Sequence, residues 1–217
     1  MTNNTINYDD NIKKYLDTHY VAKLQLGCGT FPIDGWLNTD RTRGLCKKGI
    51  IYLDVTKPFN IPNSSFDYVY SEHLFEHLTH KEQKSMLMEC HRILKPGGII
   101  RISTPNIEFL IDLYLHPEKE INKAYIEFDA HRTRQPNNSV YAINHFHTDW
   151  GHKIIHSPES LTNILVRTGF KNICQCEVGE SKHALLINVE QHKQHFNNAD
   201  SKYDFNRLQT MVLEGEK

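Results

Sequence analysis

The stretch LQLGCGT at residues 24–30 decides the fold, because an apolar strand runs there directly into a Gly-x-Gly turn. Two later strand-like segments each end in an acid: WLNT is followed by Asp40, and IIYL by Asp54. Glycines let a backbone lie against a ligand, and carboxylates accept hydrogen bonds from ribose hydroxyls or from an adenine amine. The three segments together therefore predict a nucleoside-binding site.

The composition limits the class of protein. With 217 residues, 39% of them hydrophobic, we expect one domain with room for an added subdomain. The net charge of -1 gives no overall field that would attract nucleic acid or an anionic membrane, so we expect no nucleic-acid partner.

The cysteines and the N-terminus bear on the compartment. Five cysteines, an odd number with no Cys-x-x-Cys pair, fit reduced thiols better than a disulfide framework. No apolar run approaches the length of a membrane span, and Met1–Asp10 lacks the basic and apolar regions of a signal peptide. We therefore expect a cytoplasmic protein without a membrane span.

The first half of the chain predicts five strands, at Ala22–Leu26, Leu37–Thr39, Gly49–Leu53, Phe66–Ser71 and Ile99–Ser103. Only a few residues separate the first two strands, and Pro32 and Gly35 among them disfavour a helix. We therefore expect the first helix to be reduced to a loop. A capping box of Thr79 and Glu82 opens a later helix, which the turn at Lys95–Gly98 ends.

The second half is less regular. Ile107–Leu115 is predicted as a helix, and another opens at Ser157-Pro158-Glu159, where an N-cap, a proline and an acid follow one another. Two final strands, Lys171–Glu177 and Ala184–Val189, are expected to form an antiparallel hairpin. Residues 191–217 are polar and Asn-rich, and we expect a polar C-terminal tail, either frayed or docked as a helix.

This alternation of strands and helices predicts an α/β protein with a mostly parallel sheet covered by helices. Ligands in such sheets bind beyond the carboxyl ends of the strands. Gly27, Asp40, Asp54 and Ser71 all fall at those ends. Their agreement is stronger evidence for a binding site than any one of these motifs.

Three segments carry a family resemblance: LQLGCG at residues 24–29, FDYV followed by EHLFEHL within residues 66–78, and ECHRILKPGG at residues 89–98. The chain resembles the class I S-adenosylmethionine-dependent methyltransferases. Within them it looks most like compact bacterial enzymes associated with sugar and surface-glycan biosynthesis, since the segments at residues 35–40 and 179–181 suit that branch.

The resemblance implies a Rossmann-like, doubly wound, mostly parallel seven-stranded sheet with a C-terminal antiparallel hairpin and a reduced first helix. Residues 1–190 would form the methyltransferase domain, and an insertion at 105–156 would build the acceptor pocket. Residues 191–217 would remain outside as the polar tail.

The resemblance also implies a cofactor, S-adenosyl-L-methionine, with S-adenosyl-L-homocysteine as product. Asp40 would bind the ribose hydroxyls, Asp54 the adenine amine, and Val55 would pack on the adenine ring. Ser71, Glu72 and His73 would line the floor near the sulfonium. The full set of expected cofactor residues is Leu26, Gly27, Cys28, Gly29, Thr30, Asp40, Arg41, Asp54, Val55, Ser71 and Glu72.

A dense run of histidines, HFHTDWGH at residues 145–152, suggests the catalytic group. If the run is extended, His145 and His147 point the same way, and either could act as a general base near neutral pH. A metal site of His145, His147, Asp149 and His152 is an alternative, but it matches no established ligand spacing, so no metal is expected. The third alternative is a polar loop.

His73 is a rival base, because it falls where the fourth strand opens into the pocket, whereas His77 is expected to cap or pack. The candidate catalytic residues are thus His147, His73 and His145. Arg132 and Arg134 could clamp a phosphate or carboxylate of the acceptor. Tyr141 and His145 are further candidate acceptor contacts. An aromatic wall or a plain hydrophobic lid could form from Tyr125, Phe128, Tyr141 and Phe146.

The expected function is methyl transfer from S-adenosylmethionine to a small polar acceptor, a hydroxyl of a sugar, nucleotide sugar or glycan intermediate, as in polysaccharide biosynthesis. Two alternatives are an N- or C-methyltransferase of another small metabolite and a non-catalytic module that keeps the fold to bind a partner. The sequence does not indicate an oligomeric state.

Overall fold

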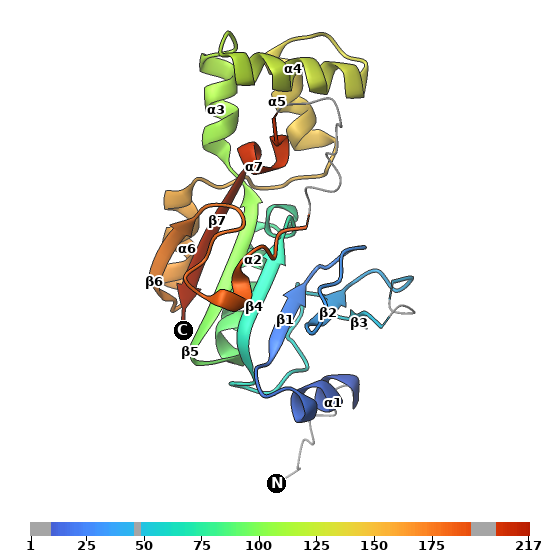
Figure 1. The fold of residues 1–217 in the computed structure, drawn as a ribbon, viewed down its shortest axis with the longest axis vertical. Coiled ribbons are helices and arrows are strands. Elements are labelled where there is room, and N and C mark those ends of the chain that lie inside the picture. The colour runs from blue at the N-terminus through green and yellow to red at the C-terminus, as the bar shows by residue number, and fades with distance from the viewer. Residues whose placement is uncertain (1–9, 46–48, 192–202) are drawn as a thin grey trace.

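The computed structural model describes residues 10–45, 49–191 and 203–217. Its centre is a seven-stranded sheet in the order β3-β2-β1-β4-β5-β7-β6 (Figure 1). The first five strands in that order are parallel, and β7 runs antiparallel to both β5 and β6. The strands are β1 (Lys23–Leu26), β2 (Leu37–Asp40), β3 (Ile51–Tyr52), β4 (Phe66–Glu72), β5 (Leu94–Pro105), β6 (Lys171–Cys176) and β7 (Thr210–Glu216). The expected α/β sheet, mostly parallel with antiparallel C-terminal strands, is confirmed.

The helices follow the predicted signals closely at their starts. Thr79 and Glu82 form the expected capping box, and Ser157 caps the helix that opens with Pro158. No helix lies between β1 and β2, where Pro32 and Gly35 interrupt the chain. The helices are α1 (Asp10–Thr18), η2 (Phe75–His77), α2 (His80–Ile93), α3 (Ile107–Leu115), α4 (Glu120–Thr133), α5 (Ser139–Thr148), α6 (Pro158–Arg167), η3 (Ala184–Leu186) and α7 (Phe205–Gln209), of which η2 and η3 are 3₁₀ turns.

Two expectations for the C-terminal region are wrong. Residues 184–189 contain the 3₁₀ turn η3 rather than a strand, and Ile187 just after it is 46% exposed. The seventh strand is instead β7, from the segment expected to be a polar tail. Met211, Val212 and Leu213 are buried there because the strand lies between β5 and β6, where both faces are covered. Residues 192–202 of the expected tail lie outside the described residues.

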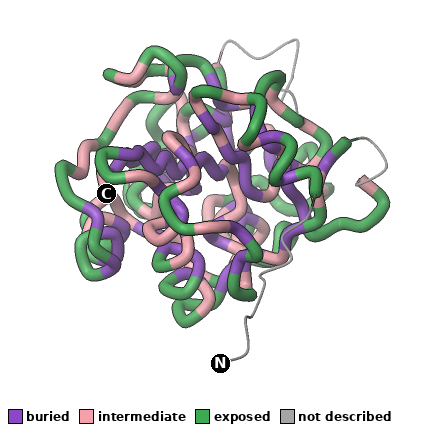
Figure 2. The backbone as a smooth tube through the Cα atoms, turned by 90° about the horizontal axis from the view of Figure 1, so that it is seen from below, coloured by how far each residue is buried: buried purple, intermediate pink, exposed green. Residues whose placement is uncertain are grey.

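The described residues form three apolar clusters, and the two larger ones position the site. The first packs the sheet against α1, α2 and α6, with Leu24, Val69 and Ile102 fully buried. The second joins α3, α4, α5 and α7, which stand beyond the carboxyl ends of β4 and β5 (Figure 1). Buried backbone runs through the interior of the molecule, with exposed loops around it (Figure 2). The helical cluster therefore covers the edge of the sheet where a ligand is expected.

A buried ion cluster fixes the segment after β6 to the sheet. Arg101 of β5 donates from Nε to Glu190 at 2.7 Å and from Nη1 to Glu214 of β7 at 2.6 Å. All three side chains are almost fully buried. Glu190 also accepts a hydrogen bond from the Gly179 N–H at 3.0 Å, so the cluster orders the connection that leaves β6.

Within the described residues, no helix combines the length and apolar character that a bilayer crossing requires. Cys28, Cys90, Cys174 and Cys176 are free thiols, and Cys46 lies outside the described residues.

Candidate active site

A crevice of about 500 Å³ lies beyond the carboxyl ends of β1, β2 and β4. Its walls include five of the residues expected to bind the cofactor: Gly27, Asp40, Arg41, Asp54 and Val55. Parallel strands bring these side chains together because their carboxyl ends share one edge of the sheet. Three of the four strand-tip residues that the sequence singled out, Gly27, Asp40 and Asp54, therefore meet at one cavity.

The glycine turn after β1 is built by backbone that ordinary residues avoid. Gly27 has φ 64° and Gly29 has φ 53°, both in the left-handed region. A Cβ added at Gly27 would lie 3.0 Å from Leu74 side-chain atoms. The Asp40 carboxylate lies beside this turn, where Oδ2 accepts from the Gly29 N–H at 3.0 Å and Oδ1 from the Thr42 N–H at 2.7 Å.

Asp54 closes the crevice after β3. Its Oδ1 accepts hydrogen bonds from the Thr56 hydroxyl at 2.8 Å and from the Thr56 N–H at 3.0 Å. The Thr56 side chain is the main reason that the pKa of Asp54 lies below its ordinary value, so the carboxylate is ionised at neutral pH. The apolar side chains of Leu53, Val55 and Leu78 also line the crevice.

This donor set fits S-adenosylmethionine. Two carboxyl groups at the tips of neighbouring strands can accept from ribose hydroxyls and an adenine amine, and the apolar residues can cover an adenine face. The remaining expected cofactor residues do not line the crevice. Leu26, Cys28 and Ser71 are buried. Gly29 supports Asp40, Thr30 is exposed, and Glu72 accepts from the Gln191 N–H at 2.9 Å.

A second cavity, of about 160 Å³, lies between the sheet edge and the helical cluster. Five of its twelve wall residues are apolar or aromatic: Pro105, Tyr125, Phe128, Phe146 and Trp150. Asp129 and Arg132 add polar groups. His73, His77 and Trp150 line both this cavity and the crevice, so the two spaces adjoin at these side chains.

His73 follows β4 and has a left-handed backbone, with φ 46°. Such a conformation is strained in a residue other than glycine, and it is often found at functional sites. Its Nδ1 lies 3.2 Å from Glu76 Oε1, and its Nε2 lies 3.2 Å from Thr210 Oγ1. Burial lowers the pKa of His73, but the hydrogen bond and charge of Glu76, together with Glu72 and Asn206, raise it more, so the net pKa lies above its ordinary value.

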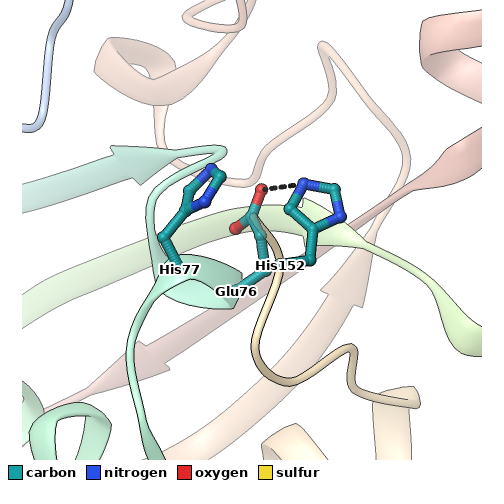
Figure 3. Close-up of side chains that lie close together, drawn as sticks. All are labelled: Glu76, His77 and His152. Carbon is teal, nitrogen blue, oxygen red and sulfur yellow. Dashed lines mark ion pairs between the residues drawn. The ribbon is translucent and has the colours of Figure 1, made fainter. Parts of the chain in front are cut away.

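Glu76 is at the centre of a group of imidazoles. Its side chain is fully buried, Oε2 accepts from Thr104 Oγ1 at 3.0 Å, and Oε1 lies 3.9 Å from His152 Nε2. Figure 3 shows His77 and His152 on either side of this carboxylate. Burial lowers the pKa of His152 to about 4, so its imidazole is neutral at neutral pH. His77, expected only to cap or pack, instead lines both cavities.

The structure does not bring the histidines of residues 145–147 to the site. They lie in α5, so the condition of an extended backbone is not met, and the two side chains point in different directions. His145 Nδ1 lies 2.6 Å from Asp129 Oδ2, behind the wall of the second cavity. His147 lines a separate apolar cavity with Ile111 and Tyr114.

The four-residue metal site considered from the sequence does not form either. His147 lies in that separate cavity, and Asp149 is 3.4 Å from Arg132. His152 alone reaches the imidazole group around Glu76.

The expected acceptor residues do not all line the second cavity. Arg132 lines the second cavity, where it pairs with Asp129 at 2.8 Å and lies over the Trp150 ring at 5.6 Å. Arg134, at the exposed end of α4, and Tyr141, 45% exposed on α5, do not line it. Tyr125, Phe128 and Phe146 form the aromatic wall without Tyr141.

Comparison with known proteins also finds similarity to S-adenosylmethionine-dependent methyltransferases. Residues 38–102 match a family described as "Methyltransferase domain". A Mycolicibacterium smegmatis protein named "Probable S-adenosylmethionine-dependent methyltransferase" is 41% identical over 46 residues. That match covers 21% of this chain and 17% of that protein, so it spans only a small part of the relative.

Solved structures share the fold across nearly the whole chain. An S-adenosylmethionine-dependent methyltransferase from Archaeoglobus fulgidus matches with a TM-score of 0.51 and 18% identity, over 96% of this chain and 92% of that one. One from Mesorhizobium loti matches with a TM-score of 0.54 and 16% identity, over 91% of each chain. At such identities the likeness establishes the fold.

Proposed function

We propose that this chain is a class I S-adenosylmethionine-dependent methyltransferase that methylates a hydroxyl oxygen of a small polar acceptor, namely a sugar, nucleotide sugar or glycan intermediate. The observation that carries this proposal is the meeting of two cavities at His73, His77 and Trp150. One cavity carries the acids suited to an adenosyl group, and the other has aromatic walls suited to an acceptor. For this class of acceptor, the role that we propose is in polysaccharide biosynthesis.

The crevice residues would hold the cofactor by complementary contacts. Asp40 would accept from the ribose hydroxyls, Asp54 would accept from the adenine amine, and Val55 would pack on the ring. When bound, S-adenosylmethionine supplies an electrophilic methyl group, so that an O–CH₃ bond forms while the S–CH₃ electron pair returns to sulfur. The chain therefore has mainly to align the acceptor, exclude water and remove a proton.

The second cavity supports a sugar-like acceptor. Aromatic faces such as those of Tyr125, Phe128 and Trp150 can pack on the apolar face of a sugar ring. Asp129 and Arg132 place a hydrogen-bond acceptor and a donor fork on the same wall. Because Arg132 is already paired with Asp129 and Asp149, its guanidinium is oriented before a ligand arrives.

His73 is the proposed general base. With Nδ1–H donated to Glu76, its Nε2 carries the lone pair that takes the acceptor proton, and the carboxylate stabilises the imidazolium that results. Imidazole is the side chain whose ordinary pKa best suits proton uptake near neutral pH. The strained backbone holds the ring at the boundary of the two cavities.

Calorimetry with S-adenosylmethionine tests the cofactor part, and mass spectrometry of a panel of sugars and nucleotide sugars tests the acceptor. We expect binding, followed by acceptor gain of one methyl group on oxygen. Absence of binding at millimolar cofactor would remove every methyltransferase assignment. Methylation on nitrogen or carbon of another metabolite would replace the hydroxyl acceptor.

The base is tested with His73→Asn, because asparagine tolerates the left-handed backbone better than most residues. At saturating cofactor, turnover should fall about 100-fold or more, the usual contribution of a general base. The matched control, His147→Gln, changes a histidine of the separate apolar cavity and should stay close to the parent. Equal turnover in the two variants would exclude His73 as the base.

A further inference from the structure

We propose that Glu76, His77 and His152 bind a divalent transition-metal ion, of the zinc, iron or manganese class. The ion would lie beside the second cavity, which is the acceptor cavity of the proposed function. Their ligand atoms, one carboxylate oxygen and two imidazole nitrogens, all lie within 4.8 Å of one another (Figure 3). Zinc takes such ligands at about 2.0–2.2 Å, so small side-chain rotations would bring all three to one ion.

The surroundings of the Glu76 carboxylate favour a bound cation. It is fully buried, and among the described residues its ion-pair contacts within 4.0 Å are two imidazoles, those of His73 and His152, with no lysine or arginine. Buried carboxylates are normally paired with a fixed positive charge or bound to metal. Thr104 already holds the second oxygen at 3.0 Å, the kind of outer hydrogen bond that orients a metal-binding carboxylate.

The backbone brings the three ligands together independently of their side chains. Glu76 and His77 are neighbours in η2, whereas His152 lies in the loop after α5. The main-chain N–H groups of Lys153 and Ile154 both donate to the Glu76 carbonyl, at 2.8 Å and 3.2 Å. These bonds hold the loop with His152 against η2, so the ligands are positioned before an ion binds.

Three protein ligands leave coordination positions open, as in catalytic rather than structural zinc sites. All three residues line the acceptor cavity. This role rests on the proposed function: the ion would hold the acceptor oxygen and lower the pKa of its hydroxyl. The O–H bond then breaks with its electron pair kept on oxygen, and the proton passes to His73 Nε2.

A second group of potential ligands must be separated from this one. Cys174 and Cys176 lie with their sulfurs 3.9 Å apart and near Glu214. Glu214 is already engaged by Arg101, but the thiols alone can capture zinc. The binding test therefore uses the Cys174→Ser/Cys176→Ser protein as its parent.

Zn²⁺ is titrated by calorimetry into this chelator-treated parent in the absence of S-adenosylmethionine. We expect one equivalent to bind, and affinity to fall about 10- to 100-fold or more in both His77→Gln and His152→Gln. His131→Gln, which removes an exposed histidine of α4, should bind as the parent does. No binding by the parent, or undiminished affinity in both site variants, would overturn the proposal.

Activity separates the metal site from the wider function. Chelator-treated enzyme should still bind S-adenosylmethionine but lose methyl transfer, and added Zn²⁺ or Mn²⁺ should restore it. Undiminished transfer by the metal-free enzyme would show that the ion does not hold the acceptor. Histidine-dependent Zn²⁺ binding in a protein that fails to bind the cofactor would support the metal site and refute the proposed function.

Discussion

Asp40 accepts a hydrogen bond from the Gly29 N–H at 3.0 Å, so the acid that ends β2 also holds the turn that follows β1. Its other oxygen accepts from the Thr42 N–H at 2.7 Å, and the residue is only 9% exposed. The carboxylate is therefore ordered before any ligand arrives, which reduces the entropy lost on binding.

Two replacements of Asp40 distinguish its support of the Gly29 turn from its proposed contact with the cofactor. Asp40→Ala removes both the charge and the support of the turn, and should weaken S-adenosylmethionine binding about 10- to 100-fold, since hydrogen bonds to charged groups contribute about 1.5–3 kcal/mol. Asp40→Asn keeps an oxygen for Gly29 and should lose less. Calorimetry measures both affinities, and an Asp40→Ala protein that binds like the parent would exclude Asp40 as a cofactor residue.

The two glycines of the turn should differ when each is changed to alanine. Both have left-handed backbones, which cost an L-residue roughly 1–2 kcal/mol. At Gly27 the new Cβ also meets Leu74 at 3.0 Å, whereas at Gly29 no atom lies within 4 Å. Chemical denaturation should therefore show a larger loss of unfolding free energy for Gly27→Ala. The reverse order would mean that the turn is built differently.

The buried Arg101 should be essential to folding stability. Arg101→Met leaves Glu190 and Glu214 buried without their cation, a change that typically costs about 3–5 kcal/mol. Changing Arg101→Met together with Glu190→Gln and Glu214→Gln removes the charges as a group and should cost less than the single change. Urea unfolding measures the stability of both variants. A triple variant that is less stable than Arg101→Met would contradict this account.

His156 should make the protein sensitive to acid. Its ring lies 3.0 Å from Gln83 Oε1 and 2.9 Å from Ser160 Oγ, and burial lowers its pKa below the ordinary 6.5. As pH falls below about 6.5, His156 becomes protonated in the unfolded chain but stays neutral in the folded chain. The free energy of unfolding therefore decreases.

The comparison is with His156→Gln, whose side chain does not titrate. The unfolding free energy of the parent should fall relative to that of the variant between pH 7 and pH 5, by at most about 1.4 kcal/mol per pH unit. A difference that stays constant across this range would show that His156 is not held neutral.

Local patterns were sufficient to predict the parallel half of the sheet. The strand at Leu24–Leu26 leads directly into a Gly-x-Gly turn, and the capping box at Thr79 has a fixed spacing, so neither signal depends on distant residues. The acids at Asp40 and Asp54 could be placed because each directly follows a strand. Topology then brought them to one crevice.

The strand β7 and the positions of the histidines depend on contacts between distant residues, which local sequence patterns do not indicate. Met211, Val212 and Leu213 form a short apolar group in a polar region, and they become a strand only because β5 and β6 provide two partners. The metal-binding role proposed for His77 has no local signal, because it depends on His152, far along the chain. His145 and His147 were misplaced because a two-residue spacing carries meaning only in extended backbone.

The position of β7 has a consequence for how the molecule assembles. In the described sheet, β6 is attached solely through β7, and β5 keeps an open edge until residues 210–216 arrive. Pairing β7 with β5 closes a long span of chain, so we expect it to slow folding and to leave the edge of β5 exposed until the pairing forms. Slowing that last step, for instance with a polar residue at Met211, should increase aggregation during refolding by more than the lost stability alone would explain.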